Sequence, residues 1–461
     1  MPERTCRFIP SLPPRILPRK LMKILQLVTR TLLPACFCFP LFLPANSGLV
    51  LAQDTDTPAP QWFKGNLHTH SLWSDGNDFP ENIIHWYKEH DYDFLALTEH
   101  NRIAEGERWM SLKDIQKRSH GKAMDRLEAN FGTDWAVTRG DQEQGTIEVR
   151  LRTLAECREK LEVPGQFLMV QAEEITDSVG KRPVHMNVTN VRELILPAGG
   201  RSVREAVANN LRAVSEQRKK TGQPMIVHLN HPNFGWGVTA DDLAFVTDEQ
   251  YFEVYNGHPS IRHLGDETHP GVEKIWDIVN TLRIKKYGGR PLLGLGTDDS
   301  HHYYGQGDSR NGRGWIYVRS TDLHGDAIVE AIEKGDFYAS SGVELADLQY
   351  DPQSKTMRYE IAAKPDVTYE VALIATPKSV ALPESGANTD PVAYSALLQQ
   401  VPEIGQVIQV TNETAGEFTC QDDWLFARIV ITSSEDPVDP SFKGQKQQAW
   451  LQPFGFVDAT E

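Results

Sequence analysis

Cysteine is scarce in this chain, and its scarcity excludes two classes of protein. Only five cysteines occur in 461 residues, and Cys6, Cys36 and Cys38 lie within the first 52 positions. The remaining two, Cys157 and Cys420, are too few for a disulfide framework or for a zinc site built from thiolates. They form either one disulfide in an oxidising compartment or two buried thiols, and the sequence favours neither alternative.

Basic residues are also in deficit, most of all after position 52. The chain has 47 Lys and Arg against 63 Asp and Glu, and residues 1–52 contain seven of these bases but only one acid. Residues 53–461 therefore carry a formal charge of −22. Because such a surface repels nucleic acid and anionic membranes, we expect a small-molecule substrate and no nucleic-acid partner. Nothing in the sequence indicates an oligomeric state.

The first 52 residues have the pattern of a secretory signal. Basic residues precede an apolar centre at 32–43, and residues 50–52 supply a small-residue cleavage site before Gln53. We expect a secreted or periplasmic protein with no stable membrane insertion once the signal is removed. The long basic flank leaves a translation start at Met22 open. An uncleaved anchor is a second alternative, although three prolines interrupt the segment.

Residues 62–345 alternate between buried strands and helices. Apolar runs such as 94–97 and 292–296 alternate with amphipathic segments such as 80–91 and 202–220. This alternation predicts an α/β domain. Six or seven strands end in ligand-type residues, which favours a closed or nearly closed βα barrel over an open sheet, whose ligands gather at one switch point.

Three other segments flank or interrupt this predicted barrel. Residues 53–61 are a short polar linker, and residues 102–165, which are charged and helix-prone, are predicted to be an insertion over the active face. Beyond residue 345, short alternating strands are separated by Pro, Gly, Ser and Asp. We therefore assign residues 346–461 to a small all-β, sandwich-like domain without substantial helices.

Residues 66–76 hold two histidines and a carboxylate at the mouth of a predicted strand. In an extended segment the side chains at i and i+2 leave the same face, so His68 and His70 can share one metal ion. Asp75 follows a predicted turn and can return a carboxylate to the same cavity or to a neighbouring ion. On its own, however, such a pair is more often two histidines satisfied by hydrogen bonds.

Other predicted strands end in the same kinds of residue. Together with the first stretch they supply nine nitrogen and oxygen donors and no sulfur, which suits two or three divalent ions such as Zn, Mn or Fe. These candidate metal ligands are His68, His70, Asp75, His100, Glu174, His185, His231, Asp299 and His301. Nearby residues of similar type are expected to orient the ligands by hydrogen bonding: Glu173, His228, Asp298 and His302. Three others are expected to orient ligands or contact substrate: Glu253, Asn256 and His258.

In their order and spacing these motifs resemble the PHP (polymerase and histidinol phosphatase) superfamily of metal-dependent hydrolases, over roughly residues 62–345. The motifs are His68-Thr69-His70 with Asp75, Thr98-Glu99-His100-Asn101, Glu174-Ile175-Thr176, His185, His231-Pro232 and Asp299-Ser300-His301. The resemblance implies a distorted seven-stranded βα barrel with a trinuclear metal centre. It places the first ion on His68, His70, Glu174 and Asp299, the second on Glu174, His185 and His231, and the third on Asp75, His100 and His301.

The resemblance also implies hydrolysis. Two ions bridged by Glu174 would lower the pKa of a shared water and give a metal-bridged hydroxide. We expect a phosphoesterase (EC 3.1) that acts on a small phosphomonoester or phosphodiester, with a protonated His231 or a released His301 assisting the leaving group. The predicted catalytic residues are Glu174, His231, Asp299 and His301. The predicted substrate-binding residues are Asn101, Asn187, Asn230 and Arg313.

Two alternative functions stay open. Secreted PHP-like proteins include a branch resembling carbamate and carboxylic ester hydrolases, for which an apolar pocket is expected. The aromatic residues near the motifs that could line one are Trp73, Trp109, Trp236, Tyr303 and Tyr304. The other alternative is a non-catalytic binding module, which the complete ligand set disfavours.

Overall fold

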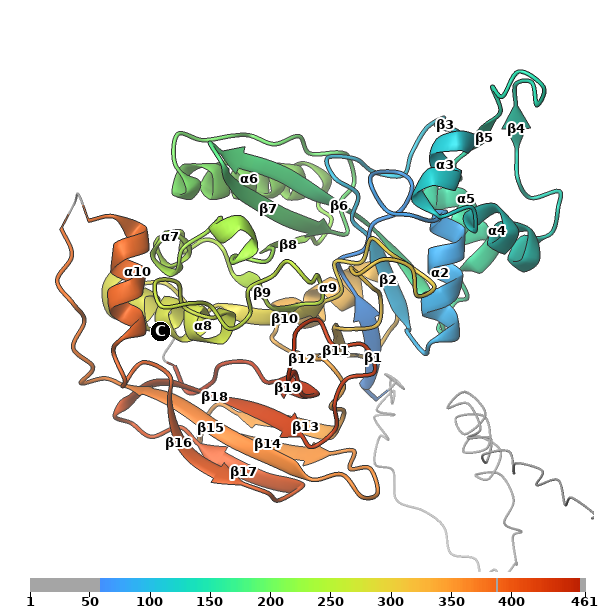
Figure 1. The fold of residues 1–461 in the computed structure, drawn as a ribbon. Helices are drawn as coiled ribbons and strands as arrows, with labels where there is room; N and C mark the ends of the chain where they lie inside the picture. The colour runs from blue at the N-terminus through green and yellow to red at the C-terminus, as the bar shows by residue number, and fades with distance from the viewer. Residues whose placement is uncertain (1–58, 387–388, 457–461) are drawn as a thin grey trace, which may run out of the picture. The chain divides into compact units, whose positions relative to one another are not determined.

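The computed structural model describes residues 59–386 and 389–456 (Figure 1). The predicted signal at 1–52 and most of the predicted linker at 53–61 lie outside the described residues. Within the described part of the chain, no helix is long and apolar enough to cross a membrane.

A large mixed sheet runs through this part of the chain. Its strands are β1 (Gln61–Asn66), β2 (Phe94–Leu97), β6 (Leu168–Val179), β7 (Arg182–Thr189), β8 (Ile226–Leu229), β9 (Tyr251–Asn256), β10 (Leu293–Thr297), β11 (Trp315–Ser320), β12 (Phe337–Ser340), β15 (Tyr369–Pro377), β16 (Gln406–Thr411), β18 (Trp424–Ser433) and β19 (Gln448–Trp450). The order is β10-β9-β8-β7-β6-β2-β1-β11-β12-β19-β18-β15-β16. Neighbours are parallel at β1–β2, β2–β6, β8–β9 and β9–β10, whereas β7 is antiparallel to both β6 and β8.

Helices connect these strands, and the predicted helices at 80–91 and 202–220 are present. The longest, α6, begins at Ser202, whose side chain accepts a hydrogen bond from the Glu205 amide, and ends at Gly222 in the left-handed conformation (φ 71°). The connecting helices are α2 (Pro80–Glu89), α6 (Val203–Thr221), α7 (Ala240–Phe245), α8 (Val272–Leu282) and α9 (Gly325–Glu333), with short turns η1 (Phe234–Trp236) and η2 (Arg283–Tyr287).

The α/β class is confirmed, but a closed barrel is not. Strand β10 forms a ladder with β9 alone among the described strands. One isolated parallel bridge, Thr69 with Ser300, joins the continuations of β1 and β10, and the His70 amide donates to the Ser300 carbonyl at 3.0 Å. This bridge brings the two ends of the β1-to-β10 series together at the rim. Closure into a seven-stranded barrel stays a prediction.

The predicted insertion at 102–165 is a small folded region that packs on α2 (Figure 1). Ile115, Leu127 and Cys157 of the insertion share an apolar cluster with Ile83 and Tyr87 of α2. Its elements are β3 (Trp109–Ser111), α3 (Leu112–Arg118), α4 (Ala123–Phe131), β4 (Thr138–Arg139), β5 (Glu148–Arg150) and α5 (Leu154–Leu161).

Glu81 of α2 is a buried acid that faces this insertion. Its Oε1 accepts a hydrogen bond from the Trp135 indole at 2.9 Å, and burial raises the pKa of Glu81 to about 7. Between about pH 4.5 and 7 the folded protein retains a proton that the unfolded chain has lost, so this carboxyl's contribution to stability falls as pH rises. We expect Glu81→Gln to raise the free energy of unfolding by about 3 kcal/mol at pH 8 and by less than about 1 kcal/mol at pH 5.

Urea unfolding of parent and variant at both pH values measures this difference. Glu89→Gln at the exposed end of α2 is the matched control and should change neither value. A variant that is less stable than the parent at pH 8 would contradict the expectation.

The region beyond residue 344 is rich in β-structure, as predicted, but two features differ from a separate all-β domain. Strands β15, β16, β18 and β19 extend the large sheet through the pairing of β12 with β19. A second sheet of β13 (Leu345–Asp351), β14 (Thr356–Ile361) and β17 (Ala415–Thr419) packs on them in a sandwich-like manner. The other difference is helix α10 (Pro391–Gln399), which packs near α7 and α8 (Figure 1).

Helix α10 has a start signal in the sequence around residue 390. Helix α10 begins with Asp390, whose side chain accepts from the Val392 amide, followed by Pro391 in the first turn. The prediction of a region without substantial helices did not include this start signal.

Cys157 and Cys420 are buried free thiols in different apolar clusters, so the unpaired alternative is the one present.

Candidate metal centre

All nine predicted ligands meet at one edge of the large sheet. Seven of them follow the carboxyl ends of parallel strands, which meet at this edge, whereas Glu174 lies within β6 and His185 within the antiparallel β7. The nine ligands lie in four overlapping groups, within each of which the donor atoms are no more than 4.8 Å apart. The groups are His68 with His70 and Glu174; His68 with His231 and Asp299; His100 with Glu174 and His185; and His70 with Asp75, His100 and His301.

The donors predicted for the first ion have spacings that fit a metal. His68 Nε2 is 3.2 Å and His70 Nε2 is 3.3 Å from Asp299 Oδ1, and the two nitrogens are 3.6 and 3.5 Å from the Glu174 oxygens. Two ligands bound to one ion at about 2.1 Å stand about 3.0 to 3.4 Å apart. The observed separations are close to that range and longer than the usual hydrogen bond of about 2.9 Å.

Two orphaned atoms give a second test of this fit. His68 Nε2 and His70 Nε2 are fully buried, and neither has a hydrogen-bond partner among the described residues. Leaving a buried polar nitrogen unpaired costs about 1 to 3 kcal/mol. A cation between these nitrogens and the Asp299 and Glu174 carboxylates would satisfy all four side chains, so the residues fit a divalent ion.

The other predicted ligands also converge, although not wholly in the implied sets. Asp75 oxygens lie 3.4 Å from His100 Nε2 and 3.3 Å from His301 Nε2, as implied for the third ion. His185 Nδ1 and His231 Nε2 approach the same Glu174 oxygen, at 3.0 and 3.7 Å. These two histidines nevertheless belong to different donor groups. Both histidines implied for the second ion therefore lie near Glu174, but their donor atoms do not form one group with it.

Burial and neighbouring charges set the protonation of these groups. Burial and the nearby His301 and His100 lower the pKa of His70 to about 3, which leaves its imidazole neutral and able to bind a metal. Burial opposes ionisation of Glu174, but His100 and His185 hold its pKa well below the usual value. The Glu174 carboxylate is therefore charged although it is inaccessible to solvent.

Two buried side chains orient the ligands. Glu253 Oε1 lies 2.6 Å from His68 Nδ1, and its other oxygen accepts from the His231 amide at 2.7 Å. Asn230 Nδ2 donates to Glu174 Oε1 at 2.8 Å. A partner on Nδ1 directs Nε2 of His68 toward the donor group, an arrangement typical of metal-binding histidines.

The four residues expected to play orienting roles are absent from the donor groups found among the described residues. Glu173 accepts from the Ile195 amide, and Asp298 accepts from the amides that follow residue 311. His228 lies 3.6 Å from Glu253, whereas His302 lies 3.6 Å from the exposed Asp308. His228 reaches the ligands through Glu253, and His302 reaches them through Ser309, whose amide donates to His302 Nδ1 and whose hydroxyl donates to the Asp299 carbonyl.

The predicted substrate-binding side chains are engaged inside the protein. Asn101 exchanges hydrogen bonds with the backbone of Thr176, and Asn187 donates to the Leu67 carbonyl. The Arg313 guanidinium, 5% exposed, contacts Asp439 and the carbonyls of Gly257 and Asp308. Asn230 holds Glu174, as described above. These contacts give all four residues a positioning role, and their contact with substrate stays a prediction.

Of the five aromatic residues near the motifs, two are buried, Trp109 and Trp236 are partly buried, and Tyr304 is exposed. Trp73 is buried, with its indole donating to the Arg152 carbonyl, and Tyr303 is buried, with its hydroxyl on the His70 carbonyl. Trp236 stacks on His269 at 4.1 Å. The aromatic ring at the donor groups is instead Phe234, 5.1 Å from the ring of His231. Sequence reasoning missed it, and its only signal was its position three residues after a predicted ligand.

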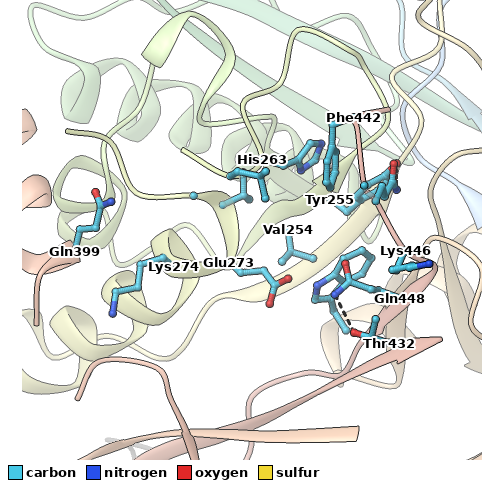
Figure 2. A pocket seen from close by; sticks show the side chains of 16 residues that line it. Val254, Tyr255, His263, Glu273, Lys274, Gln399, Thr432, Phe442, Lys446 and Gln448 are labelled. Carbon is cyan, nitrogen blue, oxygen red and sulfur yellow. Dashed lines mark hydrogen bonds between the residues drawn. The ribbon is translucent and has the colours of Figure 1, made fainter. Parts of the chain in front are cut away.

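A cavity of about 500 Å³ lies apart from the predicted ligands, and none of them lines it. Figure 2 shows Tyr255, His263 and Phe442 gathered together, with Lys274 and Gln399 farther along the cavity. Its charged groups are already engaged: Lys274 Nζ donates to the Ile404 carbonyl at 2.5 Å, and Glu273 pairs with Arg428 at 3.2 Å. The donor geometry, and not cavity size, therefore identifies the candidate site.

Comparison with known proteins found no matching family model and no matching curated protein. A solved structure from Bacteroides vulgatus ATCC 8482, described as a two-domain protein containing a predicted PHP-like metal-dependent phosphoesterase, is similar at 14% identity with a TM-score of 0.36. The match covers 86% of this chain and 96% of that one.

A second solved structure, from Bifidobacterium adolescentis ATCC 15703, is described as a candidate metal-dependent phosphoesterase. It matches at 14% identity with a TM-score of 0.25, over 52% of this chain and 89% of that one. TM-scores this low do not establish a shared fold, so the metal centre rests on the donor atoms of this chain.

Proposed function

We propose that this protein is a secreted or periplasmic metal-dependent phosphoesterase that hydrolyses a small phosphomonoester or phosphodiester. The observation that carries the proposal is the convergence of the unpartnered Nε2 atoms of His68 and His70 on the carboxylates of Asp299 and Glu174. Support for the location comes from the signal-like pattern of residues 1–52.

Charge balance favours a phosphoryl substrate. Three divalent ions would bring six positive charges to a centre whose donor groups include three carboxylates, Asp75, Glu174 and Asp299. Glu253, buried against His68, adds a fourth negative charge. The surplus of about two positive charges, or about one once the expected hydroxide is counted, suits an anionic phosphoester, whereas a neutral carbamate or ester would leave it uncompensated.

Divalent ions held by these residues would supply Lewis acidity for charge that develops on the phosphoryl oxygens and for activation of water. The protein's own residues orient the ligands and exclude water. Glu253 and Asn230 hold His68 and Glu174 in place, and burial of those ligands keeps the base of the centre dry. The part predicted for His231 and His301 in protonating the leaving group stays a prediction.

Metal removal tests the proposal directly. We expect the purified chain to contain two or three equivalents of Zn, Mn or Fe by mass spectrometry and to hydrolyse 4-nitrophenyl phosphate or its bis-ester. Prolonged chelation should abolish turnover, and one of the three ions should restore it. No bound metal and no turnover would contradict the proposal. Faster turnover of a 4-nitrophenyl carbamate or carboxylic ester than of either phosphate would replace it with the ester-hydrolase alternative.

A further inference from the structure

An open cavity of about 380 Å³ adjoins the candidate metal centre. One wall is the β6–β7 hairpin around residues 176–185, and the other is Phe234 and Gly235 of η1. The cavity shares two residues with the centre: His185 belongs to a donor group, and Thr176 Oγ1 lies 2.6 Å from His100 Nδ1. If the reacting group of a substrate binds among the donor atoms, the rest of the substrate can lie in this neighbouring cavity.

Phe234 forms the apolar wall of the cavity where it meets the centre. Its ring lies 5.1 Å from the ring of His231, 6.1 Å from that of His185 and 6.1 Å from that of His258. The side chain is half-buried, so part of the ring faces solvent. An exposed aromatic ring beside ligand groups favours a flat, apolar substrate group against it.

The two walls are held together, so the cavity is formed before any ligand enters. Gly235 has a φ of 57°, and a Cβ at this position would lie 3.2 Å from the Pro183 ring. A Cβ on Gly237 would lie 2.2 Å from the Pro183 carbonyl oxygen. Arg182 also donates from Nε to the Gly237 carbonyl at 2.9 Å. A preformed site avoids the entropic cost of ordering its walls on binding.

Lys181 provides a free positive charge at the far end of the cavity. It is exposed at the hairpin tip, and within the described part of the chain it has no hydrogen bond or ion pair. The neighbouring charges are engaged: Arg182 pairs with Asp242 at 2.6 Å, and the Asp177 carboxylate accepts from the Gly199 amide at 2.9 Å and from the Asn210 side chain. The partners of Asp177 are neutral amide groups, so Lys181 is the unpaired positive charge of the cavity beside one carboxylate.

The hairpin register sets the distance between this charge and the centre. Thr176 pairs with His185 and Val179 with Arg182, so Lys181 is four residues beyond His185 along the hairpin. At about 3.3 Å per residue, its backbone is about 13 Å from that of His185. A long lysine side chain can shorten this span by folding back along the cavity.

We propose that this cavity binds the organic part of the substrate, with an aromatic group against Phe234 and a second anionic group at Lys181. This inference rests on the proposed phosphoesterase function and narrows its substrate class to aryl phosphates that carry a distal carboxylate or phosphate. It also assigns to the β6–β7 hairpin a role in specificity beyond its role in presenting His185.

The test uses the purified full chain with its resident metals and two non-hydrolysable phosphonates. One is 4-ethylbenzylphosphonate, and the other carries a propionate in place of the ethyl group. Calorimetry should show tighter binding of the propionate compound by the parent protein. Lys181→Met should weaken binding of that compound roughly three- to fivefold, the upper part of the range for one exposed ion pair, and leave the ethyl compound unchanged. Lys181→Glu should reverse the preference.

Two further variants separate a local effect from a general one. Lys219→Met removes another exposed lysine, from the last turn of α6, and should change neither affinity. Phe234→Leu should weaken both arylphosphonates but not methylphosphonate. The inference is wrong if Lys181→Met still prefers the propionate compound, or if this variant binds both compounds equally more weakly than the parent does. It is also wrong if neither compound binds the parent protein.

Turnover of the two corresponding aryl phosphates is measured in parallel and tests the proposed function separately. Hydrolysis of both without any dependence on Lys181 would leave the phosphoesterase and overturn the subsite. Phosphonate binding that depends on Lys181, with no hydrolysis of either phosphate, would support the subsite and overturn the phosphoesterase.

Discussion

Replacing Asp299 with asparagine should lower kcat/KM by roughly a thousandfold or more and reduce the bound metal by about one equivalent. Asp299 Oδ1 is the oxygen that both His68 Nε2 and His70 Nε2 approach, at 3.2 and 3.3 Å. An amide of the same size carries no charge and is a poor ligand for a divalent ion. Metal analysis by mass spectrometry and steady-state kinetics on the same preparation measure the two losses together.

Two companion variants show whether the loss is specific to the donor group. Glu253→Gln keeps the ligands and weakens the hydrogen bond to His68 Nδ1, so it should cost only about ten- to a hundredfold in activity or metal affinity. Asp308→Asn changes a carboxylate beside His302 whose side chain is 82% exposed, and this variant should affect neither activity nor metal content. Full metal content and normal turnover in Asp299→Asn would remove Asp299 from the centre.

The convergence of the candidate ligands could be predicted because it depends on backbone geometry alone. His68 and His70 share a face by strand periodicity, and His100 and Asp299 reach the same edge because β2 and β10 end there. The division of histidines around Glu174 could not be predicted in this way. It depends on where side-chain rotamers put the donor atoms: those of His185 group with His100 and Glu174, and those of His231 group with His68 and Asp299.

The substrate contacts were harder to predict, because polar residues near a site have two competing uses. Asn101, Asn187 and Asn230 are predicted to donate to the substrate, yet each donates inside the protein, to backbone or to Glu174. Backbone groups at a strand end must be satisfied when buried, and asparagine is well suited to this task. Phe234 and Lys181, in contrast, belong to turns whose shape is set by packing against Pro183 and by the hairpin register.

The limits of the carboxyl-terminal region were also set by contacts that local patterns do not contain. Alternating strands correctly indicated β-structure after residue 345, but the pairing of β12 with β19 spans more than a hundred residues. Gln452 adds another long-range link, because its side chain exchanges hydrogen bonds with the amide and carbonyl of Gly294 in β10. A distant segment thus contacts β10, and the described residues, 59–386 and 389–456, belong to one compact unit.

Replacing Arg428 with methionine should destabilise this whole unit by about 3 to 5 kcal/mol. Arg428 of β18 is 2% exposed and forms two hydrogen bonds with Asp277 of α8, from Nε to Oδ1 at 2.7 Å and from the guanidinium to Oδ2 at 2.8 Å. Asp277 is itself 2% exposed, so the variant leaves a buried carboxylate without its cation. Methionine has a side chain of similar length, so the variant removes the charge, together with the guanidinium's contact over the Trp276 ring at 5.1 Å, without a large loss of volume.

A double-mutant cycle, measured by urea unfolding, separates the ion pair from the fold around it. Arg428→Met with Asp277→Leu removes both buried charges and should recover much of the stability lost in the single variant, because an apolar pair needs no desolvated partner. A cost below about 1 kcal/mol for Arg428→Met, or no recovery in the double variant, would show that the pair contributes little.

Because Asp277 lies on a helix of the α/β region and Arg428 on a carboxyl-terminal strand, a single cooperative transition in all variants would mean that the two regions unfold together. Two transitions in the Arg428 variant alone would instead identify this pair as the contact that couples them.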